Sequence, residues 1–182
     1  MKVSREQVAE NRQRILDAAA RLFRERGFES VTVAEIMSAA GLTHGGFYGH
    51  FASKEALIDA AMAHQPSSQR GRVTLESPAR YADSYLSRQH RDNVGSGCQF
   101  AALGTEAARA SKEVRQTLTK SLRSQIEALS AASPGATQQE RRHAAMASLA
   151  TMMGGVMLAR LVDDDSLSDE ILVAARESLR LT

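Results

Sequence analysis

Residues 32–54 have the sequence TVAEIMSAAGLTHGGFYGHFASK, and this stretch decides the fold. Thr32 and Glu35 form a capping box, in which a hydroxyl and a carboxylate satisfy free backbone N–H groups at a helix start. Gly41 ends this short helix, and a second short helix is predicted from a Thr43 cap to about Gly49. Two short helices joined by a tight turn are typical of the helix-turn-helix motif.

Further helix signals flank this motif. Ser4 and Gln7 predict a capping box that opens a first helix, with an apolar stripe at helical spacing and an end at Gly27. Ser53 predicts the cap of a fourth helix that continues through Ala61. Residues 1–64 are therefore expected to form one domain built on the three-helix helix-turn-helix plan.

The rest of the chain also predicts helices. Residues 65–77 are polar and are expected to link two domains, after which Pro78 restarts helix at a position where its missing N–H costs nothing. Four more helices are expected, at about 98–110, 112–132 after a Ser111 cap, 138–162 after a Thr137 capping box, and from a Ser166 or Ser168 cap onward. No stretch alternates like a strand. The predicted fold is all-α, with domains at 1–64 and 65–182.

Composition and charge narrow the classes of function. The net charge is +2, and residues 1–64 hold eight basic and eight acidic residues, so any affinity for DNA must come from a few positioned groups. Cys98 is the single cysteine, which excludes an intrachain disulfide and a multi-cysteine zinc site, and no metal or cofactor is expected. The N-terminus has no apolar signal core, and the uncharged stretch 144–159 falls short of a membrane span. A cytoplasmic protein that does not bind membranes is expected.

Three glycines stand in the second helix of the motif, at 45, 46 and 49. Each costs a helix about 1 kcal/mol relative to alanine, so a compensating reason is needed. Close approach of the backbone to another surface is one such reason. Thr43 and His44 stand at the helix start, where free N–H groups favour phosphate and short polar side chains reach base edges.

Of the residues from 47 to 54, some are predicted to contact DNA and others to pack in the core. Tyr48 and Lys54 are predicted to contact phosphates, while Phe47 and Phe51 are predicted to lie in the core. His50 has a spacing that suits either a phosphate contact or the capping and packing of a small helical domain.

The stretch from Gly41 to Leu57, GLTHGGFYGHFASKEAL, resembles the signature of tetracycline-repressor (TetR/AcrR) type regulators. The segments ILDAAARLF at 15–23, Gly27-Phe28 and TVAEI at 32–36 are similar too, so the resemblance runs from about residue 11 to 61. It implies an all-α dimer with an N-terminal DNA-binding domain and a C-terminal domain that binds an effector. Regulators of this kind usually repress transcription and leave the operator when a small molecule binds.

The resemblance also implies roles for individual residues. Thr43, His44, Gly45 and Gly46 would face the major groove. The residues that would hold phosphates are Thr32, Tyr48, His50 and Lys54. Lys2 and Arg5 would reach the adjacent minor groove. Gly49 departs from the family's pattern, which often has a larger residue there, and so removes a possible contact.

The last two predicted helices are candidates for a dimer contact, because one helix-turn-helix buries little surface and operators for such folds are usually palindromic. The residues expected to pair with a second copy as a four-helix bundle are Met152, Gly154, Gly155, Val156, Leu158, Ile171, Leu172 and Leu179. The alternative is that these residues form the core of a single chain.

Two features suggest what the second domain senses. Cys98 follows Gly95-Ser96-Gly97 near a helix start, which favours a thiolate that oxidants or electrophiles modify; alternatively, it is a small residue packed under the helix. Met152 and Met153, with Met146 and Met157, suit a pocket for an apolar small molecule, although such methionines also serve as plain core or dimer contacts.

An enzyme is not expected. Cys98 and His90 suggest a thiol nucleophile with a base, but no orienting partner or glycine-rich oxyanion turn accompanies them, and His90 is expected to face solvent. No phosphate loop, dinucleotide fingerprint or pair of metal ligands is present in the sequence. A DNA-binding architectural protein without sequence preference is the stronger rival to a repressor, although the balanced charge of residues 1–64 disfavours it.

Overall fold

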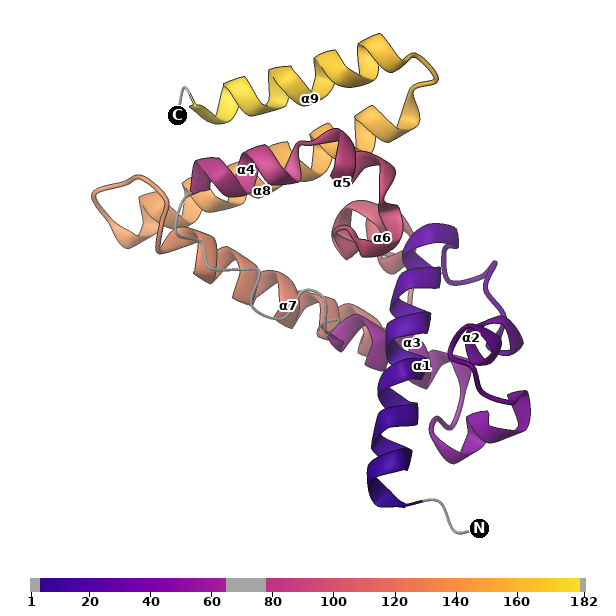
Figure 1. Ribbon diagram of the computed structural model, residues 1–182. Coiled ribbons are helices and arrows are strands. Elements are labelled where there is room, and N and C mark those ends of the chain that lie inside the picture. The colour runs from indigo at the N-terminus through magenta and orange to yellow at the C-terminus, as the bar shows by residue number, and fades with distance from the viewer. Residues whose placement is uncertain (1–3, 65–77, 181–182) are drawn as a thin grey trace. The chain divides into compact units, whose positions relative to one another are not determined.

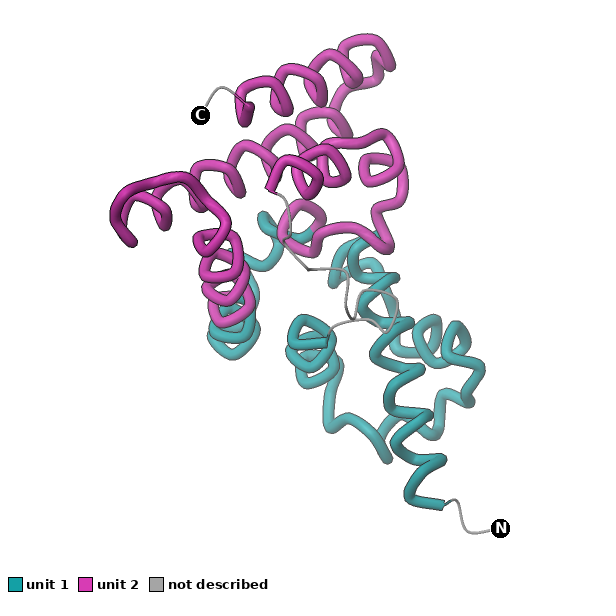
Figure 2. The backbone as a smooth tube through the Cα atoms, turned by 60° about the vertical axis from the view of Figure 1, so that its left-hand side comes forward, with its two compact units in different colours: residues 1–72, 103–118 teal, residues 73–102, 119–182 magenta. Residues whose placement is uncertain are grey.

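The computed structural model describes residues 4–64 and 78–180, and within these ranges every regular element is a helix (Figure 1). This confirms the predicted all-α class. The chain divides into two compact units, coloured separately in Figure 2. Unit 1 comprises the described residues within 1–72 and 103–118, and unit 2 those within 73–102 and 119–182. Lys2 and the predicted linker 65–77 lie outside the described residues.

Unit 1 contains four N-terminal helices: α1 (Arg5–Arg26), α2 (Val33–Ala39), the 3-10 helix η1 (His44–Gly49) and α3 (Lys54–Ala63). The long helix α1 packs against α2 and α3, and α2 packs against η1 (Figure 1). The buried side chains come from all four helices and their turns, and include Ile15, Phe23, Phe28, Ile36, Met37, Phe47, Phe51, Leu57 and Met62.

Local hydrogen bonds explain where these helices begin. The Ser4 hydroxyl accepts from the backbone N–H of Gln7 at 3.1 Å, but the predicted return bond is absent, because the Gln7 amide donates to Glu10 and Asn11 instead. Thr32 and Glu35 form both bonds of their capping box. The hydroxyl of Ser53 caps α3, as predicted.

Gly41 makes the tight turn of the motif. Its φ of +67° is in the left-handed region that favours glycine. Its N–H donates to the carbonyl of Ser38, and the next N–H, of Leu42, donates to the carbonyl of Met37, both at 2.9 Å. This pair of bonds is a Schellman ending, which satisfies the last carbonyls of α2 and redirects the chain into η1.

Unit 1 also includes residues 103–118, which are distant in sequence. The Glu106 carboxylate accepts from the backbone N–H of Phe28 at 2.7 Å. A Cβ added to Gly27, which has a φ of +82°, would lie 2.2 Å from a Glu106 oxygen, so glycine is needed there. The Thr117 hydroxyl donates to Asp59 of α3 at 2.5 Å. These contacts attach the segment 103–118 to the helices of the motif.

Unit 2 is built from α4 (Pro78–Tyr85), α5 (Arg88–Asp92), η2 (Val94–Ser96), the first residues of α6 (Gln99–Ala107), most of α7 (Lys112–Ser130), α8 (Gln138–Leu161) and α9 (Asp165–Arg180). The helices α8 and α9 run antiparallel side by side, and α4 contacts both (Figure 1). The predicted caps Ser111 and Thr137 are both present. The helix predicted from Pro78 is split at residues 86–87 into α4 and α5.

The core of unit 2 joins α4, α7, α8 and α9, and its buried members include Leu86, Ile126, Leu149, Met152, Val156 and Leu172. Gly155 allows the close approach, since a Cβ there would lie 2.9 Å from the Cβ of Ala175 and from Leu86. Met152, Gly155, Val156 and Leu172 were expected at a dimer contact. They are buried within the single chain instead.

The predicted start of the last helix is wrong. Asp164 caps α9, its carboxylate accepting from the N–H of Leu167 at 3.0 Å, because an aspartate stands two residues before the expected Ser166. Ser168 is only 2% exposed, and its hydroxyl donates to the carbonyl of Ala159 in α8 at 2.7 Å. Ser168 therefore ties α9 to α8 rather than capping a helix.

The expectation that the apolar stretch of α8 is too short for a membrane span also needs correction. By length and composition alone, α8 is long and apolar enough to cross a membrane. Its inward face, which includes Leu149 and Met152, packs in the core of unit 2, as the core helix of a folded domain does.

Candidate nucleic-acid interface

The second helix of the motif is a 3-10 helix, tighter than the helix expected from the sequence. Gly46 and His50 donate to the carbonyls of Thr43 and Phe47, bonds that span three residues. Thr43 occupies the cap position, but its side chain makes no cap hydrogen bond, so the predicted Thr43 cap is wrong in its chemistry. That hydroxyl therefore remains available for an outside partner.

Most of the predicted contact residues lie on the surface. The exposed ones are Thr32, Thr43, His44, Gly45, Gly46 and Tyr48, whereas His50 and Lys54 are half-buried. Five of the six exposed residues belong to the continuous segment 43–48, so they form a single surface with Thr43 at its start. We name these five residues, Thr43, His44, Gly45, Gly46 and Tyr48, the η1 surface.

The three glycines of η1 do not serve packing within the chain. A Cβ at Gly45 or Gly49 would have no atom within 4 Å, and one at Gly46 would make only ordinary contacts with Met37 and Thr43. None of the three has a positive φ. Neither backbone strain nor a close intramolecular contact explains these three glycines.

Phe47 supports the η1 surface from below. It is buried, stacks on Phe51 at 5.9 Å between ring centroids and meets the Tyr48 ring edge-on at 5.2 Å. Both phenylalanines were predicted to lie in the core, and both do. This packing turns Tyr48 outward with 71% of its surface exposed, which places its phenol at the rim of the η1 surface.

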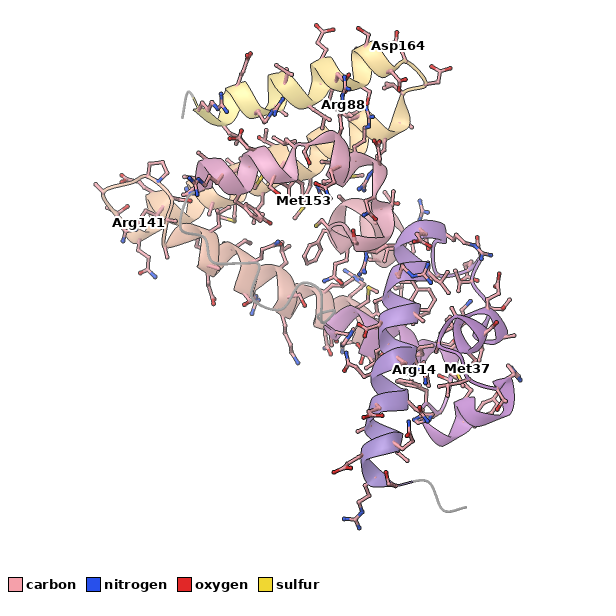
Figure 3. All side chains as sticks on the ribbon, in the orientation of Figure 1. Arg14, Met37, Arg88, Arg141, Met153 and Asp164 are labelled. Atoms are coloured by element: carbon pink, nitrogen blue, oxygen red, sulfur yellow. The ribbon has the colours of Figure 1, made fainter. Side chains whose placement is uncertain are left out.

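Two arginines of α1 support the motif, and the sequence did not identify them. The Arg12 guanidinium donates to the carbonyl of His50 at 2.5 Å and lies 4.1 Å above the Phe51 ring. Arg14 reaches the turn, since its guanidinium would lie 2.5 Å from a Cβ on Gly41. Figure 3 labels Arg14 on α1 and Met37 on α2. Only the tertiary fold brings these arginines to their contacts, because His50 lies 38 positions after Arg12 and Gly41 lies 27 positions after Arg14.

Thr32 and Lys54 already have partners in the chain. The Thr32 hydroxyl and N–H both donate to Glu35. These hydrogen bonds, with the guanidinium of Arg26 at 2.8 Å, lower the pKa of Glu35 to about 2. The Lys54 ammonium donates to the carbonyl of Glu29 at 3.4 Å, which leaves donors for a phosphate.

The three sensor candidates lie together in unit 2. Met152 is in its core, while Cys98 and Met153 are partly buried and pack against the same cluster. Cys98 directly precedes α6, and its carbonyl accepts the first bond of that helix from Ala102. Figure 3 labels Met153 on α8.

His90 does not face solvent as expected. Its Nε2 accepts from the backbone N–H of Cys98 at 2.9 Å, and its Nδ1 lies 2.6 Å from the Tyr85 carbonyl, so the ring carries its proton on Nδ1. Burial lowers the pKa of His90, which favours this neutral form. Because the free lone pair is occupied by the Cys98 amide, His90 is not placed to act as a base toward the thiol. In the described residues, no group of three or more His, Cys, Asp or Glu side chains could hold a metal ion.

A short α2, a glycine turn and an exposed second helix held against α1 define a helix-turn-helix protein of the DNA-binding class. Residues 15–61 match the family described as "Bacterial regulatory proteins, tetR family". The similarity to this family lies in the N-terminal domain, where it covers the helix-turn-helix motif.

Sequence relatives agree with this assignment. The chain is 37% identical over 84 residues to the HTH-type transcriptional regulator AcrR of Shigella flexneri, a match that covers 46% of this chain and 39% of AcrR. It is 50% identical over 48 residues to the HTH-type transcriptional repressor KstR2 of Rhodococcus jostii, covering 26% of this chain and 24% of KstR2. These matches span well under two thirds of either relative.

Solved structures extend the similarity to the whole fold. The reduced form of Escherichia coli NemR superposes with a TM-score of 0.76 at 24% identity, over 94% of this chain and 95% of that one. Salmonella enterica GusR superposes with a TM-score of 0.62 at 25% identity, over 98% and 97%. The arrangement of an N-terminal helix-turn-helix domain and a helical C-terminal domain is therefore that of tetR-family regulators.

Proposed function

We propose that this protein is a dimeric transcriptional repressor of the cytoplasm that binds a palindromic operator and leaves it when an effector binds unit 2. The observation that carries the proposal is the η1 surface together with the neighbouring Gly49. At each of the three glycines, 45, 46 and 49, the rest of the chain leaves room for a side chain. DNA binding is assigned to residues 1–64, and effector binding with dimerisation to residues 65–182.

Thr43 and His44 are the residues proposed to read base edges, with the backbone of Gly45 and Gly46 against the major groove. Both side chains are exposed at the start of η1, and short polar groups at the N-terminal end of a recognition helix contact bases in this class of motif. Tyr48, Lys54, Thr32 and His50 are proposed to hold phosphates on either side. The wild-type chain, incubated with random duplex DNA, should enrich a palindrome; recovery of unrelated sequences would support a DNA-binding architectural protein instead.

The dimer contact is proposed on the outward faces of α8 and α9. Met157, Leu158 and Leu161 are exposed on α8, and Leu161 reaches 78% exposure; Leu167 and Val173 are exposed on α9. Gly154 adds a position where a Cβ would meet nothing within 4 Å, so another helix can approach closely there. Of the eight residues expected at this contact, Gly154 and Leu158 fit it best.

Sedimentation of Leu158→Glu tests the dimer, with Ala147→Glu, on an exposed position of the same helix, as the control. The first variant should sediment as a monomer and the second as a dimer. A dimeric Leu158→Glu protein would place the contact elsewhere.

Helix α6 is the proposed route from the effector to the DNA-binding helices. It begins in unit 2 beside Cys98 and ends in unit 1, where Glu106 binds the N–H of Phe28 after α1. The proposal is that a change at the start of α6 reaches Glu106 through this helix.

Two kinds of effector are compatible with Cys98, Met152 and Met153. One is an oxidant or electrophile that modifies the thiol, and the other is a small molecule that binds without a covalent bond. Diamide treatment of wild type and Cys98→Ser on operator DNA separates them. Release of the wild type alone supports thiol sensing, and equal behaviour of the two proteins supports a bound ligand.

A further inference from the structure

The interior of unit 2 contains polar atoms without partners, and they lie near the start of α6. Among the described residues, three buried side-chain atoms have no hydrogen-bond partner: the Tyr85 hydroxyl, Gln125 Oε1 and Arg160 Nη1. Buried polar groups in folded proteins are nearly always hydrogen-bonded, so each orphan requires an explanation. Unit 2 therefore leaves two donor groups and one acceptor unsatisfied.

Arg160 is held as a cation without a carboxylate beside it. Its Nε and Nη2 donate to the carbonyls of Arg91 and His90, at 2.9 and 2.6 Å, so both bonds go to neutral acceptors. Within residues 78–180, Asp92 supplies the carboxylate charge that acts on Arg160. Asp92 already forms an ion pair with Arg91 at 2.7 Å, so it does not pair with Arg160. Burial lowers the pKa of Arg160, a sign that its charge is incompletely compensated. An anionic group is the partner that this cation lacks.

Tyr85 supplies a second donor. It is only 6% exposed, and burial together with the nearby Cys98 thiol raises its pKa, so the phenol keeps its proton. His90 connects Tyr85, Arg160 and Cys98: its ring lies 4.4 Å from the Tyr85 ring, its carbonyl accepts from Arg160 at 2.6 Å, and its Nε2 accepts from the Cys98 N–H at 2.9 Å. Gly97 is packed there too, since a Cβ on it would lie 2.8 Å from the His90 ring and 3.3 Å from Arg160 Nη2.

The remaining neighbours are aromatic rings and an amide. The rings of Tyr81 and Tyr85 are 5.9 Å apart, and those of Tyr85 and His90 are 4.4 Å apart and nearly perpendicular. The Gln125 amide nitrogen donates to the Tyr81 hydroxyl at 3.3 Å, which leaves its oxygen free to accept a hydrogen bond. Aromatic edges favour a planar ring, and the free amide oxygen favours a ligand with a hydroxyl group.

We propose that unit 2 binds a small hydroxylated aromatic carboxylic acid, whose carboxylate accepts from Arg160 and Tyr85 and whose hydroxyl donates to Gln125. This inference deepens the proposed function, because it names the chemical class of the effector and rests on unit 2 being the effector domain. The binding is non-covalent, and the Cys98 thiol takes no part in it.

Titration calorimetry of the full chain with 4-hydroxybenzoate, 4-hydroxycinnamate and the matching amides, without DNA, tests the site. At least one acid should bind at one molecule per chain and at least about tenfold more tightly than its amide, since hydrogen bonds to charged groups are the stronger kind. Tyr85→Phe and Arg160→Met should each weaken that acid at least about tenfold, because each removes one donor. Arg142→Met, on the same helix, should bind like the wild type.

Tyr85→Phe keeps the test decisive if Arg160→Met fails to fold, because phenylalanine retains the buried ring and removes only the hydroxyl group. No acid binding, equal affinity for acid and amide, or wild-type affinity in Tyr85→Phe would overturn the site. Operator binding is measured separately. An acid that binds without releasing operator DNA would leave the site standing and remove its regulatory role, whereas operator recognition without acid binding would remove the site alone.

Discussion

Replacing Gly45 by alanine should separate the stability of the protein from its function. The position has a negative φ and open space where the methyl group would stand. Alanine at a compatible glycine position restricts the unfolded chain and adds about 0.4–1 kcal/mol to the free energy of unfolding. For a chain of this size, the melting temperature should rise by about 1–4 °C.

The same methyl group should weaken operator binding. If the Gly45 backbone lies against the major groove, the added group overpacks that contact, at a cost of about 1–3 kcal/mol. That energy corresponds to a loss of affinity of roughly 5- to 150-fold. Calorimetric melting measures the first effect, and fluorescence anisotropy of a labelled operator duplex measures the second.

Gly104→Ala is the matched control. Gly104 is exposed on α6 and also has nothing within 4 Å of an added Cβ. It should raise the melting temperature without changing operator affinity. A Gly45→Ala protein that is more stable and binds the operator as tightly as the wild type would refute the assignment of η1 to the DNA contact.

Three further predictions follow from individual contacts. Glu106→Ala should lower the free energy of unfolding by about 1.5–3 kcal/mol, because the Phe28 N–H loses a charged acceptor, while Glu127→Ala on an exposed site should change little; urea titrations that do not separate the two would contradict this. The difference in free energy of unfolding between wild type and Glu35→Gln should be constant above about pH 5 and should shrink as pH falls from 4.5 to about 2, because the pKa of Glu35 is depressed in the folded state. Urea titrations that give the same difference at pH 2 as at pH 7 would contradict this. Lys54→Met should lower the slope of log affinity against log salt by about one and weaken all DNA sequences alike, whereas a selective loss would assign Lys54 to base contact.

Helix starts could be predicted from the sequence where the cap chemistry is local. The Thr32–Glu35 and Thr137–Glu140 boxes form as expected, because each joins groups three residues apart. The start of α9 was missed because Asp164 competes with nearby serines, and the local pattern does not rank them. Ser168 is buried through a bond to α8, which no local pattern contains.

In the candidate sites, too, local features could be predicted from the sequence, whereas contacts between distant segments could not. The burial of Phe47 follows from its apolar side chain, which lies four residues before Phe51, and the polar residues Thr43 and Tyr48 are exposed as expected. The support from Arg12 and the environment of His90 depend on contacts between distant segments, so the sequence left Arg12 unnoticed and placed His90 wrongly in solvent. Nothing in the sequence indicated Arg160, because the lack of a carboxylate beside its guanidinium is visible only when its neighbours in the fold are known.

The central claim is that the η1 surface reads a DNA sequence. It is tested most directly by the ratio of affinities for the selected palindrome and for a scrambled duplex of equal length, measured at about 0.15 M salt for wild type and for a Thr43→Val/His44→Ala double variant. The wild type should prefer the palindrome by about a thousandfold or more, in the range of specific DNA-binding proteins, and the double variant should lose most of that preference while retaining affinity for the scrambled duplex. A wild-type ratio near one, or a double variant with an unchanged ratio, would contradict the claim.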